Sequence, residues 1–356
     1  MNGRGKEFEG ALVSIVIPAY NHADYIGETL DSLINQTYGN MELIVVNDGS
    51  SDGTGDVIVS KLPECRERFK RVEYISKENE GIIKTLNRGL ALARGEYVYI
   101  IASDDMAEAD AIETLYGFLS ENNDYGLAVG DNYIIDDRGR RCFWNSKRDN
   151  VYDKAHARFL TFADKLKRAR SDVDFNSEDF GTYESLLQGN YVPNGYLVRK
   201  ELIDRMGGYS EDGPLEDYYL MLQLSKVAKL KYVDRPLFSY RWHGSNAIKQ
   251  TGMHEKGFKT LMNEKGYAEE HGYGQNFRDQ MPFNKRLGIP FLLEVGKRGS
   301  NKRYKAYLRL FGVKVLKWSK KMDRKVFMFL SIPVFKKTDG RGRGQVLSKA
   351  ARLKSG

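Results

Sequence analysis

The stretch YVYIIASDD, residues 97–105, decides how this chain folds. Five bulky apolar residues in succession predict a strand that is buried on both faces, as in a parallel sheet covered by helices. The strand runs directly into two carboxylates, Asp104 and Asp105. Ligands bind at the carboxyl ends of strands in open α/β sheets, where two carboxylates can hold a hard cation. The alternative is that the pair only leaves the strand and caps a helix expected at 109–119.

Strands and helices alternate along the first hundred residues. β-Branched runs ended by Pro, Gly or Asp predict the strands, and apolar residues at helical spacing predict the helices. The expected strands are 12–17, 42–46, 72–76 and 97–104, and the expected helices are 24–34, 55–62 and 82–93. This order predicts a mostly parallel sheet with right-handed crossovers, whose polar, glycine-containing loops share one edge. A nucleotide-bearing ligand is expected at that edge.

Two common nucleotide-binding classes are excluded by the loop after the first strand. Its sequence is PAYN, residues 18–21, and not the G-x-G-x-x-G of dinucleotide-binding dehydrogenases, and the chain contains no P-loop. The one dense glycine run, 340–344, follows no expected strand.

The second half of the chain gives weaker signals. Strands are expected at 127–130 and 233–240, and a helix is expected at 200–206. The segment 147–185 is polar, and we expect it to be irregular and to cover one side of the cleft. Its basic cluster at 165–170 fits a solvated helix face better than a phosphate site.

Charge is very unevenly distributed along the 356 residues. Residues 284–356 contain 21 Lys and Arg against 3 Asp and Glu, a net charge of +18, which leaves −10 for the rest of the chain. A polyanionic partner is therefore expected for the tail only. Cys65 and Cys142 are far apart in sequence, which fits a reduced cytoplasmic protein, and neither a signal peptide nor a membrane-spanning helix is expected.

In the tail, aromatic and aliphatic residues alternate with Lys and Arg from residue 303 onward. We expect a helix that lies in an anionic membrane interface, with the apolar run 326–335 entering more deeply. A packed helix pair with a solvated basic face is the first alternative. Nucleic-acid binding is the second and less favoured one, and the Arg-Gly run at 340–344 gives it modest support.

Several motifs together resemble the family-2 glycosyltransferases of the GT-A fold in order and spacing. They are VSIVIPAYN at 13–21, VVNDGSSDGT at 45–54, NEG at 79–81, LNRG at 86–89, GEY at 95–97 and SDD at 103–105. The resemblance is close over 12 to about 120 and looser to about 246. It implies an α/β nucleotide-diphospho-sugar transferase fold with a Rossmann-like, mostly parallel sheet. The implied domains are a GT-A domain at 1–250, with nucleotide-binding (12–110) and acceptor-binding (111–250) halves, and a basic, largely helical extension at 251–356.

The resemblance also implies roles for individual residues. Contacts with the nucleotide-sugar donor fall on Pro18, Ala19, Tyr20, Asn21, Asp48, Asn79, Gly81, Asn87, Ser103, Asp104 and Arg241. Asp104, helped by Asp105, is expected to bind Mg²⁺ or Mn²⁺ on the donor diphosphate, with His243 as a further ligand. Two positions depart from the family pattern: Ala102 replaces the first Asp of a D-x-D motif, and Asn47 replaces an Asp before Asp48.

The catalytic base is expected at the start of a helix that follows the Gly-Gly-Tyr turn at 207–209. A helix N-terminus stabilises carboxylates, so Glu216 and Asp217 could be two ordinary acids that complement the helix dipole. The same placement would keep Asp217 ionised, as a general base must be. By resemblance Asp217 is the base and Glu216 orients the acceptor. Phe238 stands where processive synthases have the Gln of Gln-x-x-Arg-Trp, which favours transfer of a single sugar.

The sequence therefore predicts an inverting hexosyl- or N-acetylhexosaminyltransferase of bacterial envelope glycan assembly. The expected donor is UDP-linked, and the expected acceptor is a glycan or a lipid-diphosphate-linked oligosaccharide. We expect a cytoplasmic protein held on the inner face of the cell membrane by its tail. The alternative is a non-catalytic, membrane- or RNA-associated protein that kept the nucleotide fold, and the joint presence of Asp48, Asp104 and Asp217 argues against it.

Overall fold

The computed structural model describes residues 10–249, 252–280, 293–300, 303–310, 313–321 and 329–330. The chain divides into two units, Met1–His271 and Gly272–Gly356. The first unit thus extends beyond the boundary expected at residue 250. Each unit is described by itself.

A ten-stranded mixed sheet forms the centre of the first unit, with the order β3-β2-β1-β4-β9-β6-β10-β5. Its first four strands are parallel, as the sequence predicts: β1 (Val13–Ala19), β2 (Met41–Asp48), β3 (Val72–Lys77) and β4 (Tyr97–Ile100). The short strand β9 (Tyr196–Arg199) is antiparallel and lies between β4 and β6 (Tyr125–Ile135). The last two strands of the order are β10 (Lys229–Arg241), parallel to β6, and β5 (Met106–Ala107), antiparallel to β10. A hairpin of β7 (Arg141–Trp144) and β8 (Asn150–Val151) continues from β6.

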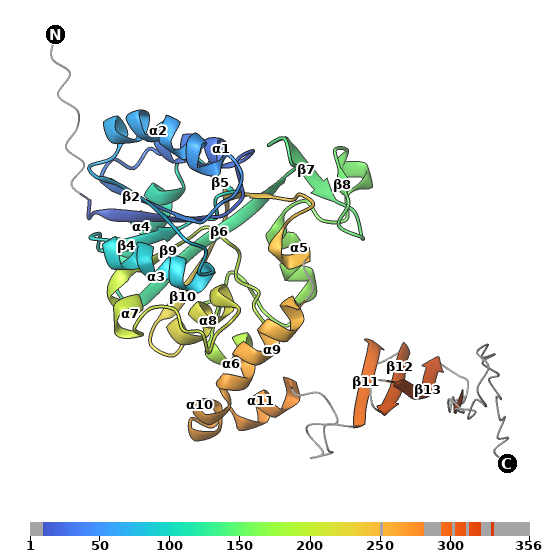
Figure 1. The fold of residues 1–356 in the computed structure, drawn as a ribbon. Helices are drawn as coiled ribbons and strands as arrows, with labels where there is room; N and C mark the ends of the chain where they lie inside the picture. Colours follow the sequence, from blue (N-terminus) through green and yellow to red (C-terminus); the bar gives the residue numbers. More distant parts are fainter. Residues whose placement is uncertain are drawn as a thin grey trace, which may run out of the picture. The chain divides into compact units, whose positions relative to one another are not determined.

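Helices cover both faces of the parallel part of the sheet. Figure 1 shows α1 (Ile26–Ile34) and α2 (Thr54–Arg68) on one side and α3 (Ile82–Leu92) on the other. All eight residues of β2 are buried, which explains why this strand reads as a continuous apolar run. Beyond β4, α4 (Ala111–Glu121) packs on β6.

The second half contains more helix than its polar sequence predicts. Two helices, α5 (Phe162–Ala169) and α6 (Tyr183–Leu186), lie within the segment expected to be irregular. The remaining helices of this unit are α7 (Lys200–Arg205), α8 (Glu216–Leu224), α9 (Met253–Asn263) and α10 (Lys265–Glu270), and short 3₁₀ turns are η1 (Lys154–His156) and η2 (Ala247–Lys249). Thr161 caps α5 by accepting a hydrogen bond from the Asp164 N–H, a local signal that the sequence analysis missed.

The second unit begins with α11 (Gly274–Gln280) and continues as an antiparallel sheet in the order β11-β12-β13-β14. These strands are Leu293–Ser300, Arg303–Leu310, Val313–Lys321 and Phe329–Leu330. The interfacial helix expected from residue 303 is therefore wrong over β12 and β13. Basic and apolar residues alternate there with a period close to two, which is the pattern of a strand. Some of the same apolar residues are also three or four positions apart, and this spacing led to the expectation of a helix.

Most of the apolar run 326–335, and all of the Arg-Gly run at 340–344, lie outside the described residues. Within the part of the chain that the structure describes, no helix has the length and apolar character needed to cross a membrane.

Gly89 is required by the packing of α3 against β1. A Cβ atom at this position would lie 2.5 Å from Cγ1 of Val16, which is too close for any side chain without a backbone shift. Gly117, in the middle of α4, has nothing within 4 Å of the same position.

We predict opposite effects of alanine at these two helical glycines. Gly89→Ala should lower the free energy of unfolding by about 1–3 kcal/mol, because it overpacks the helix–sheet contact. Gly117→Ala should raise it by roughly 1 kcal/mol through helix propensity alone. Urea denaturation followed by circular dichroism measures both, and an unchanged midpoint for Gly89→Ala would contradict the close packing.

Candidate functional site

Three side chains that could bind a metal ion meet at the carboxyl edge of the sheet. His22 follows β1, Asp104 follows β4 and His243 follows β10, and one ligand atom of each lies within 4.8 Å of the others. Nε2 of His243 is 2.9 Å from Oδ2 of Asp104, and Nε2 of His22 is 3.8 Å from the same oxygen. Asp104 and His243 are buried, whereas His22 is half-buried. We call these three residues the metal-ligand cluster.

Hydroxyl groups orient both imidazole rings of the cluster. Nδ1 of His22 lies 2.7 Å from Oγ of Ser103, and Nδ1 of His243 lies 2.8 Å from Oγ of Ser245. Each ring therefore points its Nε2 atom toward Asp104. Such a second contact on the far nitrogen is typical of histidines that bind metal ions.

The electrostatics of the cluster favour a neutral His22 imidazole beside an ionised Asp104 carboxylate. Burial lowers the pKa of His22 and outweighs the opposing attraction of Asp104. Burial would raise the pKa of Asp104, but the hydrogen bond from His243 and the nearby His22 lower it overall. Neutral imidazole nitrogens and a carboxylate oxygen are suitable ligands for a divalent metal ion.

Asp105 lies outside this cluster, contrary to the expectation that it helps to bind the metal. Its Oδ1 atom accepts a hydrogen bond from the backbone N–H of Arg241 at 2.8 Å. Burial and the neighbouring charge of Asp104 raise its pKa well above the ordinary range. Its carboxyl group is buried and holds β4 to β10 instead of facing a ligand.

Arg241 is fully buried, and its guanidinium group contacts the protein interior. Nε donates to the Asp104 carbonyl at 2.6 Å, and Nη2 is 2.5 Å from Oε2 of Glu28. Nη1 donates to the Asp136 carbonyl at 3.3 Å. Through these contacts Arg241 holds the segment that follows β4. Its charge is buried and does not face the carboxyl edge of the sheet, where a contact with phosphate was expected.

Asp48 joins two of the loops at this edge. Burial opposes its ionisation, but Lys77 and the N–H groups of Glu80 and Gly81, both at 2.9 Å, lower its pKa overall. Gly81 has φ of 90°, a conformation that favours glycine. Asp48, Asn79 and Gly81, three of the residues expected to contact the nucleotide-sugar, therefore lie close together.

The PAYN loop lies against the loop after β2. Asn21, with φ of 51°, accepts a hydrogen bond from the Ser51 N–H at 2.8 Å and donates its own N–H to Oγ of Ser50 at 3.0 Å. Asn47 also bonds Ser50, which gives this residue a role in the turn in place of the family's Asp. Pro18 and Ala19 end β1, and Tyr20 projects from the turn with 47 % of its surface exposed.

Asn87 connects the two halves of the unit and lies apart from the metal-ligand cluster. Its side chain donates to the Tyr209 carbonyl at 2.8 Å and accepts from the Tyr209 N–H at 2.9 Å. It thereby fixes the Gly-Gly-Tyr turn that precedes α8. The contacts give this residue a structural role where a donor contact was expected.

Glu216 and Asp217 occupy the first turn of α8 and are half-buried. Asp217 accepts hydrogen bonds from Nδ2 of Asn190 at 3.2 Å and from the Tyr218 N–H at 2.6 Å. Burial raises the pKa of Asp217, and burial together with the charge of Asp217 raises the pKa of Glu216 to about 7. Burial therefore outweighs the helix dipole that was expected to keep Asp217 strongly ionised.

Tyr240, near the carboxyl end of β10, is influenced by charges from two parts of the unit. Its pKa is raised first by burial and then by the charges of Asp105, Asp104 and Asp217, while Arg148 opposes them. A single side chain thus lies within electrostatic reach of the β4 carboxylates and of the first turn of α8.

His22 is the functional candidate that sequence reasoning missed. The available signal was its position directly after PAYN, at the carboxyl end of the first parallel strand. Ala102 is exposed at the same edge, so no carboxylate projects from that position. The two imidazoles supply the additional ligands that a D-x-D motif would take from its first Asp.

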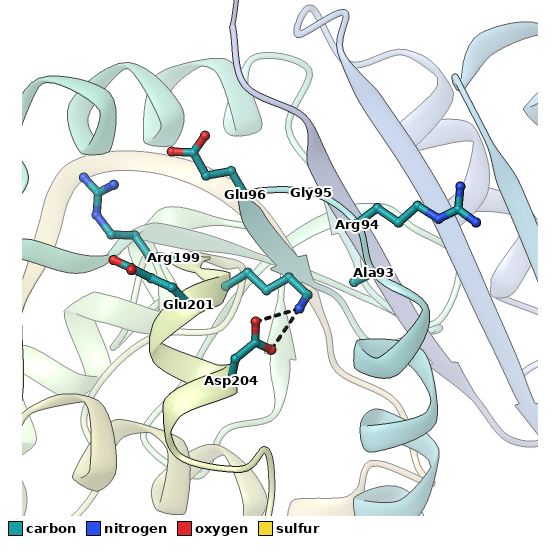
Figure 2. A pocket seen from close by; sticks show the side chains of 8 residues that line it. Ala93, Arg94, Gly95, Glu96, Arg199, Glu201 and Asp204 are labelled. Atoms are coloured by element: carbon teal, nitrogen blue, oxygen red, sulfur yellow. Dashed lines mark hydrogen bonds and ion pairs between the residues drawn. The ribbon is translucent and has the colours of Figure 1, made fainter.

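A cavity of about 450 Å³ lies away from these residues, at the amino end of β4 and the start of α7 (Figure 2). It is lined by Ala93, Arg94, Gly95, Glu96, Arg199, Lys200, Glu201 and Asp204. Lys200 is paired with Asp204 there, with Nζ 2.8 Å from both carboxylate oxygens. Since none of the expected site residues lines this cavity, we place the functional site at the opposite ends of the strands.

Residues 14–181 match the family model described as Glycosyl transferase family 2. An uncharacterized glycosyltransferase of Haemophilus influenzae is 44 % identical over 240 residues, which cover 66 % of this chain and 66 % of that protein. Glycosyltransferase GlyG of Streptococcus pneumoniae is 28 % identical over 65 % of this chain and 70 % of its own length. Glycosyltransferase GlyA of the same organism is 29 % identical over 64 % of this chain, which spans only 30 % of GlyA.

Two solved structures share the fold. S. aureus TarS 1–349 in complex with UDP-GlcNAc aligns with a TM-score of 0.53 and 18 % identity over 76 % of this chain and 72 % of its own. The mannosyltransferase PcManGT of Pyrobaculum calidifontis, in complex with GDP-Man and Mn²⁺, aligns with a TM-score of 0.50 and 18 % identity over 73 % and 65 %. At this identity the likeness concerns the fold alone.

We predict that His22→Ala weakens Mn²⁺ binding by tenfold or more, because it removes one of three nitrogen and oxygen ligands, and loss of even a supporting contact costs roughly 10–100-fold. His156→Ala is the matched control, since His156 lies on the surface turn η1. Isothermal titration calorimetry with MnCl₂ measures both. Equal Mn²⁺ affinity of the His22 variant and the control would remove His22 from the ligand set.

Proposed function

Because this chain belongs to glycosyl transferase family 2 and has the GT-A fold, we propose that it transfers one sugar from a nucleotide-sugar donor to an acceptor hydroxyl group. The observation that carries this proposal is the set of polar groups at the carboxyl ends of the parallel strands. They are the metal-ligand cluster and the Asp48 loop contacts, and the carboxylate pair of α8 is the third group of the proposal. The metal-ligand cluster suits a diphosphate, and the Asp48 loop contacts suit a nucleoside. The α8 carboxylates suit a hydroxyl group that must lose a proton.

The donor is proposed to be UDP-linked and to carry a hexose or an N-acetylhexosamine. Its base and ribose contact Pro18, Ala19, Tyr20, Asn21 and Asp48, with Asn79 and Gly81 beside them. The exposed ring of Tyr20 offers a face on which a base can stack. The two solved structures that share the fold are complexes with UDP-GlcNAc and with GDP-Man, so they support a nucleotide-sugar donor, and the choice of uracil rests on the family resemblance.

The metal is proposed to be Mn²⁺ in preference to Mg²⁺, held by His22, Asp104 and His243. Mg²⁺ prefers oxygen ligands, whereas two of these three side chains offer imidazole nitrogen. When bound, a divalent cation offsets the negative charge that develops on the leaving diphosphate. The chain's own contribution is to hold three ligand atoms within 4.8 Å of one another before a ligand arrives.

Asp217 is proposed as the general base of a single, inverting displacement. Asn190 and the Tyr218 N–H hold its carboxylate, and the proton of the acceptor hydroxyl moves to one of its oxygens as the new glycosidic bond forms. Glu216, with a pKa of about 7, is protonated in a large fraction of molecules at neutral pH and can donate a hydrogen bond to the acceptor.

The acceptor is proposed to be a glycan or a lipid-diphosphate-linked oligosaccharide presented at the cytoplasmic membrane face. The support is the net charge of +18 over residues 284–356, which is attracted to anionic lipid headgroups. Because β12 and β13 are strands, the attraction would act through a basic sheet and not through an interfacial helix.

Asp217→Asn is predicted to abolish sugar transfer while leaving UDP affinity near that of the wild type, because the base acts on the acceptor. In the wild type, kcat/KM should be at its full value above the raised pKa of Asp217 and should fall as the pH drops through that pKa. The fall should therefore occur at a higher pH than the ordinary aspartate pKa near 4. Glu216→Gln should retain activity and remove any titration near pH 7. A large loss of UDP binding in Asp217→Asn would contradict the assignment.

Deletion of residues 284–356 is predicted to release the protein from anionic liposomes. Basic residues near such a surface contribute on the order of 1 kcal/mol each, and salt weakens this attraction. Co-sedimentation with phosphatidylserine vesicles at low and high salt tests the expectation. Equal partitioning of the full-length and truncated proteins would exclude the anchor, and competition by RNA would favour a nucleic-acid partner.

A further inference from the structure

Three cations border one aromatic cluster beside the metal ligands. Arg148 lies in the β7–β8 hairpin, Lys165 on α5 and Lys249 in η2. The aromatic side chains between them are Trp144, Phe162, Tyr240 and Trp242, with ring centroids 4.8–6.3 Å apart. Among the residues that the structure describes, none of the three cations forms an ion pair with a carboxylate. We call Arg148, Lys165 and Lys249 the basic trio.

Lys165 differs from the other cations of the segment 165–170. Lys167 pairs with Asp234 at 2.9 Å, Arg168 with Asp164 at 2.7 Å and Arg170 with Asp172 at 2.8 Å. Arg168 fits the solvated face that the sequence predicts for 165–170, whereas Lys167 and Arg170 are half-buried, as Lys165 is. Lys165 differs because no ion pair with a carboxylate is found for it among the described residues, and its Nζ lies 5.2 Å from the Phe162 ring centroid.

Arg148 has an unusual backbone. Its φ is 67°, and Asn21 is the only other non-glycine residue with positive φ within the described ranges. Arginine rarely adopts this conformation, and such outliers occur often at ligand sites. The Arg148 N–H bonds the Asn145 carbonyl at 3.0 Å, and the Arg148 carbonyl accepts from Nε1 of Trp242 at 2.9 Å. The hairpin therefore holds Arg148 in place against this strain.

Trp242 brings two members of the trio together. Its ring centroid is 5.2 Å from the Arg148 guanidinium and 3.8 Å from Nζ of Lys249. Aromatic faces attract cations, but this offsets only part of the repulsion between two like charges. The pKa of Lys165 is lowered by burial and by the charge of Arg148, and no carboxylate counteracts this.

The trio is adjacent to the metal-ligand cluster. Nζ of Lys249 donates to the backbone carbonyl of His243 at 2.5 Å, and Arg148 influences Tyr240, which also senses Asp104 and Asp217. Lys249 thus lies directly beside the metal-ligand cluster, and Arg148 shares the Trp242 ring with it. A phosphate group, with several acceptor oxygens and full negative charge, is the ligand that best matches one guanidinium and two ammonium groups.

We propose that Arg148, Lys165 and Lys249 bind a phosphate group of a substrate, either the donor diphosphate or a phosphate ester carried by the acceptor. The inference rests on the proposed sugar transfer and makes it more specific. A phosphate group from the donor or from the acceptor would make the same contacts with the trio. The two cases differ in whether a nucleotide diphosphate occupies the trio.

The test uses the full-length protein with MnCl₂ and two probes, UDP and glycerol 3-phosphate, in isothermal titration calorimetry, with uridine as the phosphate-free control ligand. The variants are Arg148→Gln and the double variant Lys165→Gln/Lys249→Gln, which leaves the strained hairpin intact. Arg168→Gln is the control, since it removes one charge from α5 outside the trio. Circular dichroism checks that each variant is folded.

Weaker UDP binding in the trio variants, by roughly tenfold or more with uridine binding unchanged, supports the trio as a site for the donor diphosphate. If UDP binding is unchanged but glycerol 3-phosphate binding in the presence of saturating UDP falls by the same factor, the site serves an acceptor phosphate. Equal affinities of the wild type, both trio variants and the control for both probes would overturn the inference.

Failure of the proposed function gives a different result. A wild type that binds glycerol 3-phosphate but not UDP, and that loses this binding in the trio variants, retains the phosphate site and refutes the nucleotide-sugar donor. A wild type that binds UDP normally, with UDP and glycerol 3-phosphate binding both unchanged in the two trio variants, retains the donor and refutes the trio.

Discussion

The buried guanidinium group of Arg241 is the interaction on which the rest of the site depends. It bonds the Asp104 carbonyl and Glu28, and the Arg241 N–H bonds Asp105, so one residue joins the ends of β4 and β10 to α1. The guanidinium group is fully buried whereas the Glu28 side chain is 46 % exposed, so the two backbone carbonyls of Asp104 and Asp136 provide its buried contacts. Since His243 lies two residues beyond Arg241, the same contacts place its imidazole against Asp104. The metal-ligand cluster is therefore a consequence of how this charge is buried.

The metal ligands show how a site can change its chemistry while the backbone stays constant. Ala102 offers no carboxylate, yet the loops after β1 and β10 bring two imidazoles to the remaining Asp104. Ser103 and Ser245 orient the two rings, so both supporting contacts come from residues directly beside the ligands or two positions away. Two imidazole nitrogens and one carboxylate oxygen form a ligand set that suits transition metals better than it suits Mg²⁺.

The parallel strands and the functional edge could be predicted from sequence because both depend on local patterns. Fully buried strands such as β2 read as apolar runs, and Asp48 and Asp104 end such runs. Long-range pairings could not be predicted: no local pattern reveals that Asn87 bonds Tyr209, or that Arg241 turns inward toward Glu28. The tail was misread because Tyr304, Tyr307 and Leu308 satisfy a helical spacing, whereas alternation with Lys305 and Arg309 satisfies a strand. The spacing of apolar residues cannot distinguish a helix from a strand in so short a segment.

The second half of the first unit is completed by helices that lie beyond residue 250. Leu215, at the N-terminus of α8, donates its N–H to Oγ1 of Thr260 on α9, at 3.0 Å. Glu264, between α9 and α10, accepts from Tyr183 and Gln223 at 2.7 Å and pairs with Lys226 at 2.8 Å. Both contacts brace the helix whose first turn carries Glu216 and Asp217, and Lys256 on α9 lowers the pKa of Glu216 against the effect of burial. α9 and α10 therefore support the helix that carries Glu216 and Asp217, and both lie inside the unit that ends at His271.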